Sequence, residues 1–236
     1  MRIRLWSYAQ GEKRSSTLRG AQIQYRQRIM GTNKQYYSQW KNIFDKDRLK
    51  GSVNVIALFI TVYELLEDRI VTYPKDFYTI IEFDEEAKRN YEEHVMSLYD
   101  KDACPNINTR NKALIASLMW FKTGGAIDDD DIKVFADSRN LRNEIVHEML
   151  GTITEGADKL VEQFALMYGL FCKIEKWWIL EIEVPISGDF PSLTEEEANG
   201  AMSGYMVVLD AIIDILANDS NKHFKEVCEQ LGVLVS

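Results

Sequence analysis

The stretch DSRNLRNEIVHEM, Asp137–Met149, decides how this chain of 236 residues is interpreted. The residues around it have the apolar spacing of a helix that packs into a core, and a helix is predicted over 128–150. Yet Arg142, Asn143 and His147 lie within six positions of one another in it. Polar and charged side chains are costly in a core unless other groups match them, so these three need a specific explanation.

A helical wheel at about 100° per residue gives helix 128–150 one broad apolar face, which is predicted to meet the core. This face comprises Val134, Phe135, Ser138, Leu141, Ile145, Val146 and Met149. Arg142 falls inside the same arc, whereas Asn143 and His147 fall together on its boundary, one helical turn apart.

Three interpretations of Arg142 follow from this position. Its stem packs while its head reaches water, or it pairs with a carboxylate on a neighbouring helix, or it faces a cleft or subunit interface that binds phosphate. His147 also has a plain interpretation, as a boundary histidine bonded to a backbone carbonyl or to solvent.

The rest of the chain predicts helices only. No run alternates convincingly with a period of two, and glycine and proline are scarce. The fold class predicted is therefore an all-α helical bundle. Besides 128–150, helices are predicted over about 17–44 (one or two), 52–69, 84–99, 109–122, 154–183, 194–218 and 221–231.

Local signals place several of these helix boundaries. Ser52 is predicted to cap one helix, and Pro74 to stop that helix or follow its end. Gly151 is expected at the end of the motif helix, and the sequence TEEE at 194–197 has the spacing of a capping box. The aspartates 128–131 favour a helix start over a metal site, because no second cluster of ligands accompanies them.

Charge divides the chain unevenly. Residues 1–50 contain twelve Lys or Arg and three Asp or Glu, a balance of +9, so the remaining chain carries −18. The basic segment 1–50 also holds Tyr and Trp, which suits phosphate contacts and base stacking on RNA. Equally, it suits amphipathic helices that dock on the acidic bundle 51–236 as part of one compact domain.

The three cysteines lie far apart and form no CxxC pair, which indicates reduced thiols and a cytoplasmic protein. The first residues lack the apolar run of a signal peptide. The most hydrophobic run, 53–66, has 14 residues and contains Glu64, so it predicts a buried helix and no association with a membrane.

The pattern formed by Arg142, Asn143 and, after three further residues, His147 on one helix resembles the signature of the HEPN superfamily. These are helical-bundle proteins, many of them ribonucleases in toxin–antitoxin, abortive-infection and other defence systems. The resemblance covers 128–183, about a quarter of the chain. It implies a HEPN-like core with additional N-terminal and C-terminal helices, and a homodimer that hydrolyses RNA without a metal or other cofactor. An antitoxin or regulatory protein would be a further partner.

The resemblance also implies roles for the motif residues. His147 would act as general base or acid, Arg142 would stabilise the charge of the transition state, and Asn143 would orient the imidazole or the phosphate. Arg139 and Asn140 are candidate substrate-binding residues; seven residues separate Arg139 from His147, which is too many for the motif itself.

A second hypothesis remains open at this stage. A non-catalytic helical module with the same fold would bind a nucleotide, an antitoxin or another partner, with Arg142 in a structural ion pair. Glu148, directly after His147, and the acidic body of the chain favour it. A plain structural bundle is a third interpretation, supported by composition alone.

Overall fold

The computed structural model describes residues 46–79, 85–107, 109, 111–155, 158–188 and 194–220. The chain divides into two units, Met1–Lys46 and Asp47–Ser236, and the described residues from Asp47 onward belong to the second. The regular elements in the described residues are all helical, which confirms the predicted all-α fold. They are α2 (Lys46–Thr79), α3 (Glu85–His94), η1 (Met96–Leu98), α4 (Lys112–Thr123), α5 (Asp129–Glu155), α6 (Asp158–Trp178), η2 (Ile179–Glu183), α7 (Val184–Ser187), α8 (Glu195–Asn199) and α9 (Gly204–Ser220). The helices predicted over 17–44 and 221–231 lie outside the described residues.

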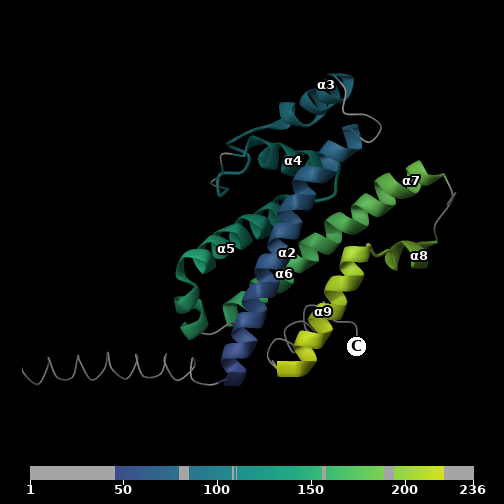
Figure 1. The fold of residues 1–236 in the computed structure, drawn as a ribbon. Helices are drawn as coiled ribbons and strands as arrows, with labels where there is room; N and C mark the ends of the chain where they lie inside the picture. Colours follow the sequence, from purple (N-terminus) through teal and green to yellow (C-terminus); the bar gives the residue numbers. More distant parts are fainter. Residues whose placement is uncertain are drawn as a thin grey trace, which may run out of the picture. The chain divides into compact units, whose positions relative to one another are not determined.

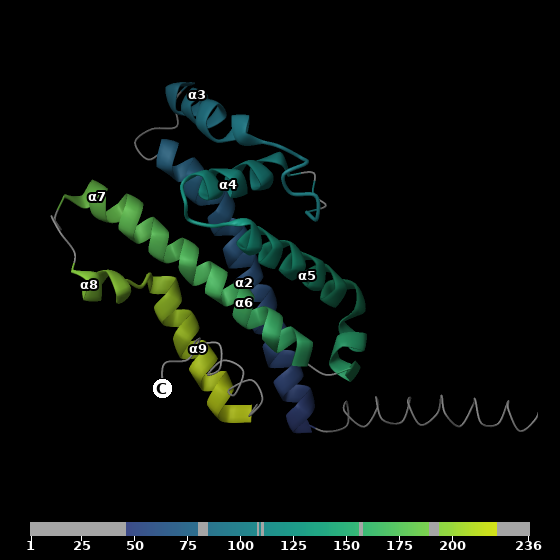
Figure 2. The same cartoon turned by 180° about the vertical axis from the view of Figure 1, so that it is seen from behind.

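Helices α2 and α6 form the centre of the second unit, with α5 on one side of this pair and α9 on the other (Figure 1; Figure 2 shows the same from behind). The helix pair buries large apolar side chains completely, which forms the core that α5 and α9 cover. Among the fully buried residues are Phe59, Val62, Leu66, Phe164, Phe171 and Ile174.

Helix α2 is longer than predicted at both ends. It begins at Lys46 instead of Ser52, and it continues through Pro74 to Thr79, so the prediction that Pro74 ends it is wrong. A proline inside a helix removes one backbone hydrogen bond, and this is tolerated where packing holds the helix together. Tyr73 stacks on Trp178 of α6 with 4.1 Å between the ring centroids, and Phe77 contacts Trp120 of α4 at 5.8 Å.

By length and composition, α2 could also cross a membrane over Leu49–Thr79. A core helix passes the same test, and 44% of its most apolar 18-residue window is buried within the chain. Length and composition alone therefore do not decide whether α2 is a membrane-spanning helix or a core helix.

The start of α5 confirms the interpretation of the aspartates as a helix start. The backbone N–H of Asp131 donates to the Asp128 carboxylate, and the backbone N–H of Asp128 donates to the Asp131 carboxylate, both at 3.0 Å. The first of these hydrogen bonds lowers the pKa of Asp128. Lys173 of α6 forms ion pairs with both carboxylates, and Lys122 of α4 pairs with Asp129 at 2.6 Å.

The C-terminal helices differ from the prediction in two places. The capping box of Thr194 and Glu197 is confirmed, but Gly200 ends α8 after five residues, so 194–218 is two helices instead of one. The helix predicted over 154–183 starts at Asp158 and passes into the π-helix η2 and then α7. The π-helix ends at Glu183, two residues before Pro185, which has no backbone N–H to donate.

Candidate functional site

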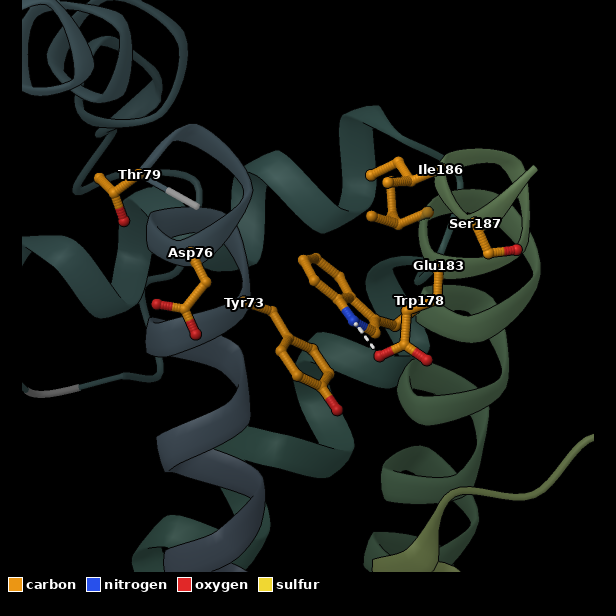
Figure 3. Close-up of a pocket in the computed structure, with 8 residues that line it drawn as sticks. Tyr73, Asp76, Thr79, Trp178, Glu183, Ile186 and Ser187 are labelled. Carbon is orange, nitrogen blue, oxygen red and sulfur yellow. Dashed lines mark hydrogen bonds between the residues drawn. The ribbon is translucent and has the colours of Figure 1, made fainter. Parts of the chain in front are cut away.

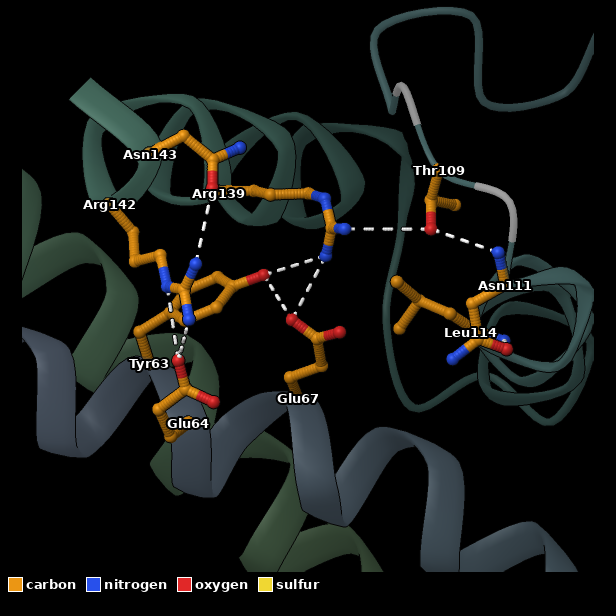
Figure 4. A network of polar contacts seen from close by, with 9 residues as sticks. All are labelled: Tyr63, Glu64, Glu67, Thr109, Asn111, Leu114, Arg139, Arg142 and Asn143. Atoms are coloured by element: carbon orange, nitrogen blue, oxygen red, sulfur yellow. Dashed lines mark hydrogen bonds and ion pairs between the residues drawn. The ribbon is translucent and has the colours of Figure 1, made fainter. Parts of the chain in front are cut away.

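Arg142 on α5 pairs with a carboxylate of α2 (Figure 4). Its Nε donates to Glu64 Oε1 at 3.0 Å, and its Nη2 donates to the same oxygen. Its Nη1 donates to the side-chain oxygen of Asn143 at 3.3 Å, and its guanidinium carbon lies 5.7 Å from the centre of the Tyr63 ring. Of the three interpretations of Arg142, the ion pair with a neighbouring helix is the one observed. The pair is not sealed, because 32% of the Arg142 side chain and 52% of the Glu64 side chain are exposed.

Arg139, one turn earlier, lies deeper between the same two helices. Its Nη1 donates to Tyr63 Oη and to Glu67 Oε2, each at 2.9 Å, and its Nη2 reaches Thr109 Oγ1 at 3.5 Å. Tyr63 in turn donates to Glu67, and burial together with this carboxylate raises the pKa of Tyr63. Only 19% of the Arg139 side chain is exposed, and its Nε is buried without a hydrogen bond from the described residues.

These contacts separate the two arginines by role. Arg139 joins α5, α2 and the loop at Thr109, because both of its Nη groups donate inside the chain (Figure 4). The geometry favours a structural role for it over the predicted substrate binding. Asn140, the other predicted substrate-binding residue, is exposed on α5.

Asn143 and His147 are both exposed on α5, as their place at the boundary of the apolar face suggested. His147 forms no hydrogen bond with a residue that the structure describes. It follows Arg142 by five positions, which places the two side chains about 140° apart around the helix axis at about 3.6 residues per turn. One chain therefore holds Arg142 and Asn143 together and directs His147 elsewhere.

The wheel is wrong about the C-terminal half of α5. Val146 and Met149, predicted to meet the core, are 54% and 45% exposed, although Phe135 and Ile145 on the same face are fully buried. The wheel reports the angle of a side chain and not whether a neighbouring helix lies opposite it. This face therefore opens to solvent after the fully buried Ile145.

The helix also breaks earlier than predicted. Glu148 has φ −131° and ψ 37°, which is outside the helical region, so α5 kinks directly after His147. Helix α5 then continues through Gly151 to Glu155, so the prediction that Gly151 ends it is wrong. The kink separates Met149 from the regular helix that carries the motif. We use the name α5 patch for the solvent-accessible residues around this part of the helix: Arg142, Asn143, Val146, His147 and Met149.

The α5 patch combines a guanidinium, an amide and an imidazole with two exposed apolar side chains. The first three groups suit a phosphate and the transfer of a proton, and the apolar side chains suit a contact with another macromolecule. Within the described residues, no group of three His, Cys, Asp or Glu side chains comes together in a way that could hold a metal ion.

The sequence did not identify Glu64, Tyr63 and Glu67 of α2 as neighbours of the motif. One signal was present, because Glu64 is a carboxylate inside the most hydrophobic run of the chain, as Arg142 is a cation inside an apolar arc. Opposite charges in two apolar stretches favour an ion pair, because the free-energy cost of removing each charge from water is smaller when the other charge lies beside it.

Comparison of the chain with protein-family models, with curated proteins and with solved structures found no match.

Proposed function

We propose that this protein is a metal-independent endoribonuclease of the HEPN type, with a catalytic site shared between two copies of the chain. The observation that supports it is the α5 patch, in which Arg142, Asn143 and His147 of the motif all reach the surface beside exposed apolar side chains. By the resemblance, such an enzyme acts as a toxin or phage-defence effector in the cytoplasm, controlled by an antitoxin or another regulatory protein.

The reaction would be a transesterification at one phosphodiester. His147 takes the proton of the ribose 2′-OH, whose oxygen attacks the adjacent phosphorus. The bond from phosphorus to the 5′ oxygen breaks, and the leaving oxygen receives a proton from water. The products are a 2′,3′-cyclic phosphate and a 5′-OH end. Arg142 stabilises the negative charge that grows on the phosphate oxygens, and Asn143 holds the guanidinium in place.

Two copies are needed because one chain directs Arg142 and His147 to different sides of α5. A two-fold contact through the α5 patch would set Arg142 of one copy beside His147 of the other, since such a contact is self-complementary. Val146 and Met149 would supply the apolar surface that this contact buries.

In the single chain Glu64 holds two donors of Arg142. An ion pair as exposed as that of Arg142 and Glu64 contributes about 0–1 kcal/mol to stability, so it is weak. The guanidinium group of Arg142 can instead form two parallel hydrogen bonds with a phosphate. A substrate phosphate would therefore compete with Glu64 for Arg142. The same ion pair favours the second candidate function, a non-catalytic HEPN-like module that binds a nucleotide, an antitoxin or another protein through the exposed side of α5.

The variant Glu64→Gln distinguishes the two functions. It removes the charge that competes with phosphate, so the nuclease proposal predicts that RNA binds several-fold more tightly, as a change of about 1 kcal/mol would give. The measurement is fluorescence anisotropy with a labelled single-stranded RNA at fixed low salt.

The matched control is Glu67→Gln on the same helix, which changes the charge beside Arg139 instead. It should leave RNA affinity within twofold of the original protein. Equal affinities for both variants and the original protein would contradict a phosphate site at Arg142 and would support the non-catalytic module.

A further inference from the structure

A cavity of about 600 Å³ lies between the C-terminal end of α2 and the segment formed by η2 and α7, on a part of the second unit that the α5 patch does not include (Figure 3). Its size is within the range of small-molecule sites in proteins. Of the described residues, eight line it: Tyr73, Asp76, Thr79, Trp178, Ile182, Glu183, Ile186 and Ser187.

The floor of the cavity is aromatic and fixed in place. The rings of Tyr73 and Trp178 stack at 4.1 Å with only 9° between their planes. Tyr73 Oη donates to the buried Glu175 at 2.6 Å, and Trp178 Nε1 donates to Glu183 at 2.9 Å. Both rings are thereby held by hydrogen bonds as well as by packing, which makes the site preformed.

Among the described residues that line the cavity, the charged groups are all negative. Asp76 and Glu183 are carboxylates, and none of these described residues is Lys, Arg or His. Asp76 pairs with none of the described residues, and Glu183 uses one oxygen for Trp178. Figure 3 shows the two carboxylates on either side of the indole, Asp76 on α2 and Glu183 on the opposite helix.

One wall of the cavity has an unusual backbone. Ile182 and Glu183 belong to the five-residue π-helix η2, and Ile186 and Ser187 follow in α7. A π turn inserts one residue and rotates every side chain after it, and such turns occur frequently at functional sites. Here the insertion lies where Glu183 and Ile186 line the cavity, and Ile186 is 63% exposed although it is apolar.

We propose that this cavity binds an organic dication with an aliphatic body, that is, a linear diamine or polyamine. One ammonium group pairs with Asp76 and the other with Glu183, and the methylene chain between them lies on Trp178 and Ile186. Aromatic faces attract cations, and apolar walls favour methylene groups. A hard divalent metal ion gathers its oxygen ligands around one centre, whereas these two carboxylates lie on either side of the indole.

The test is calorimetric titration of the full-length protein with spermidine at physiological salt. Saturable binding of one spermidine per chain is expected, and Asp76→Asn and Glu183→Gln should each weaken it at least about tenfold, since each removes a charge-assisted contact. Butylamine, with one ammonium group and a similar aliphatic body, should bind more weakly than its diamine counterpart putrescine.

The matched control is Glu181→Gln, which neutralises an exposed carboxylate of the same π-helix that does not line the cavity. It should bind spermidine as the original protein does. If all three variants bind spermidine equally, or if none of the proteins shows saturable binding, spermidine is attracted only by the general negative charge of the chain and the proposal is wrong. A denaturation curve for each variant excludes unfolding as the cause of a loss.

Discussion

Arg142→Ala and His147→Ala are each expected to lower RNA cleavage at least about 100-fold, because one removes the cation that stabilises the transition state and the other the group that moves the proton. The measurement is cleavage of total RNA by purified protein in EDTA, followed by analysis of the new ends. A 2′,3′-cyclic phosphate is expected on one side of each cut, and the chelator should change nothing.

Lys133→Ala is the matched control for this experiment, because Lys133 is an exposed cation of the same helix outside the α5 patch. It should cleave RNA at the rate of the original protein. Equal cleavage by all four proteins would show that the activity comes from elsewhere, and no cleavage by any of them would favour the non-catalytic module. Toxicity on expression that His147→Ala relieves would be the corresponding result in cells.

Arg139→Ala is expected to lower the free energy of unfolding by about 2–3 kcal/mol. This is somewhat less than the about 3–5 kcal/mol for breaking a fully buried pair, because the side chains of Arg139 and Glu67 are 19% and 27% exposed. The variant leaves Glu67 and Tyr63 without the guanidinium that both contact, and it removes the link to Thr109. Urea denaturation followed by circular dichroism measures the difference.

Arg142→Ala provides the comparison, since it breaks a pair on the same two helices that is more exposed. Its expected cost is about 0–1 kcal/mol. A larger loss of stability for Arg142→Ala than for Arg139→Ala would reverse the assignment of roles, and Arg142 would then be the structural arginine of the bundle.

The features predicted correctly from the sequence are those that depend on neighbouring residues. The hydrogen bonds between Asp128 and Asp131 and the capping box of Thr194 and Glu197 each join residues three apart, so local spacing was enough to find them. The helical period likewise identified the all-α fold, because each long helix buries one face.

The features that the sequence did not predict depend on distant residues. The ion pair between Glu64 and Arg142 joins positions 78 apart, and nothing local states which carboxylate faces which arginine. Helix α2 continues past Pro74 because Trp178, far along the chain, packs on the adjacent turn. Val146 is exposed because the apolar face of α5 opens to solvent there, which its position on the wheel does not encode.

The most direct test of a shared catalytic site is to mix the two inactive variants. Arg142→Ala and His147→Ala proteins, unfolded together and refolded, form mixed dimers in which an intact Arg142 of one copy meets an intact His147 of the other. The proposal predicts that the refolded mixture recovers a substantial fraction of the original RNA cleavage, although each variant alone has almost none. A mixture that forms mixed dimers and stays as inactive as its components would contradict a site shared between two copies.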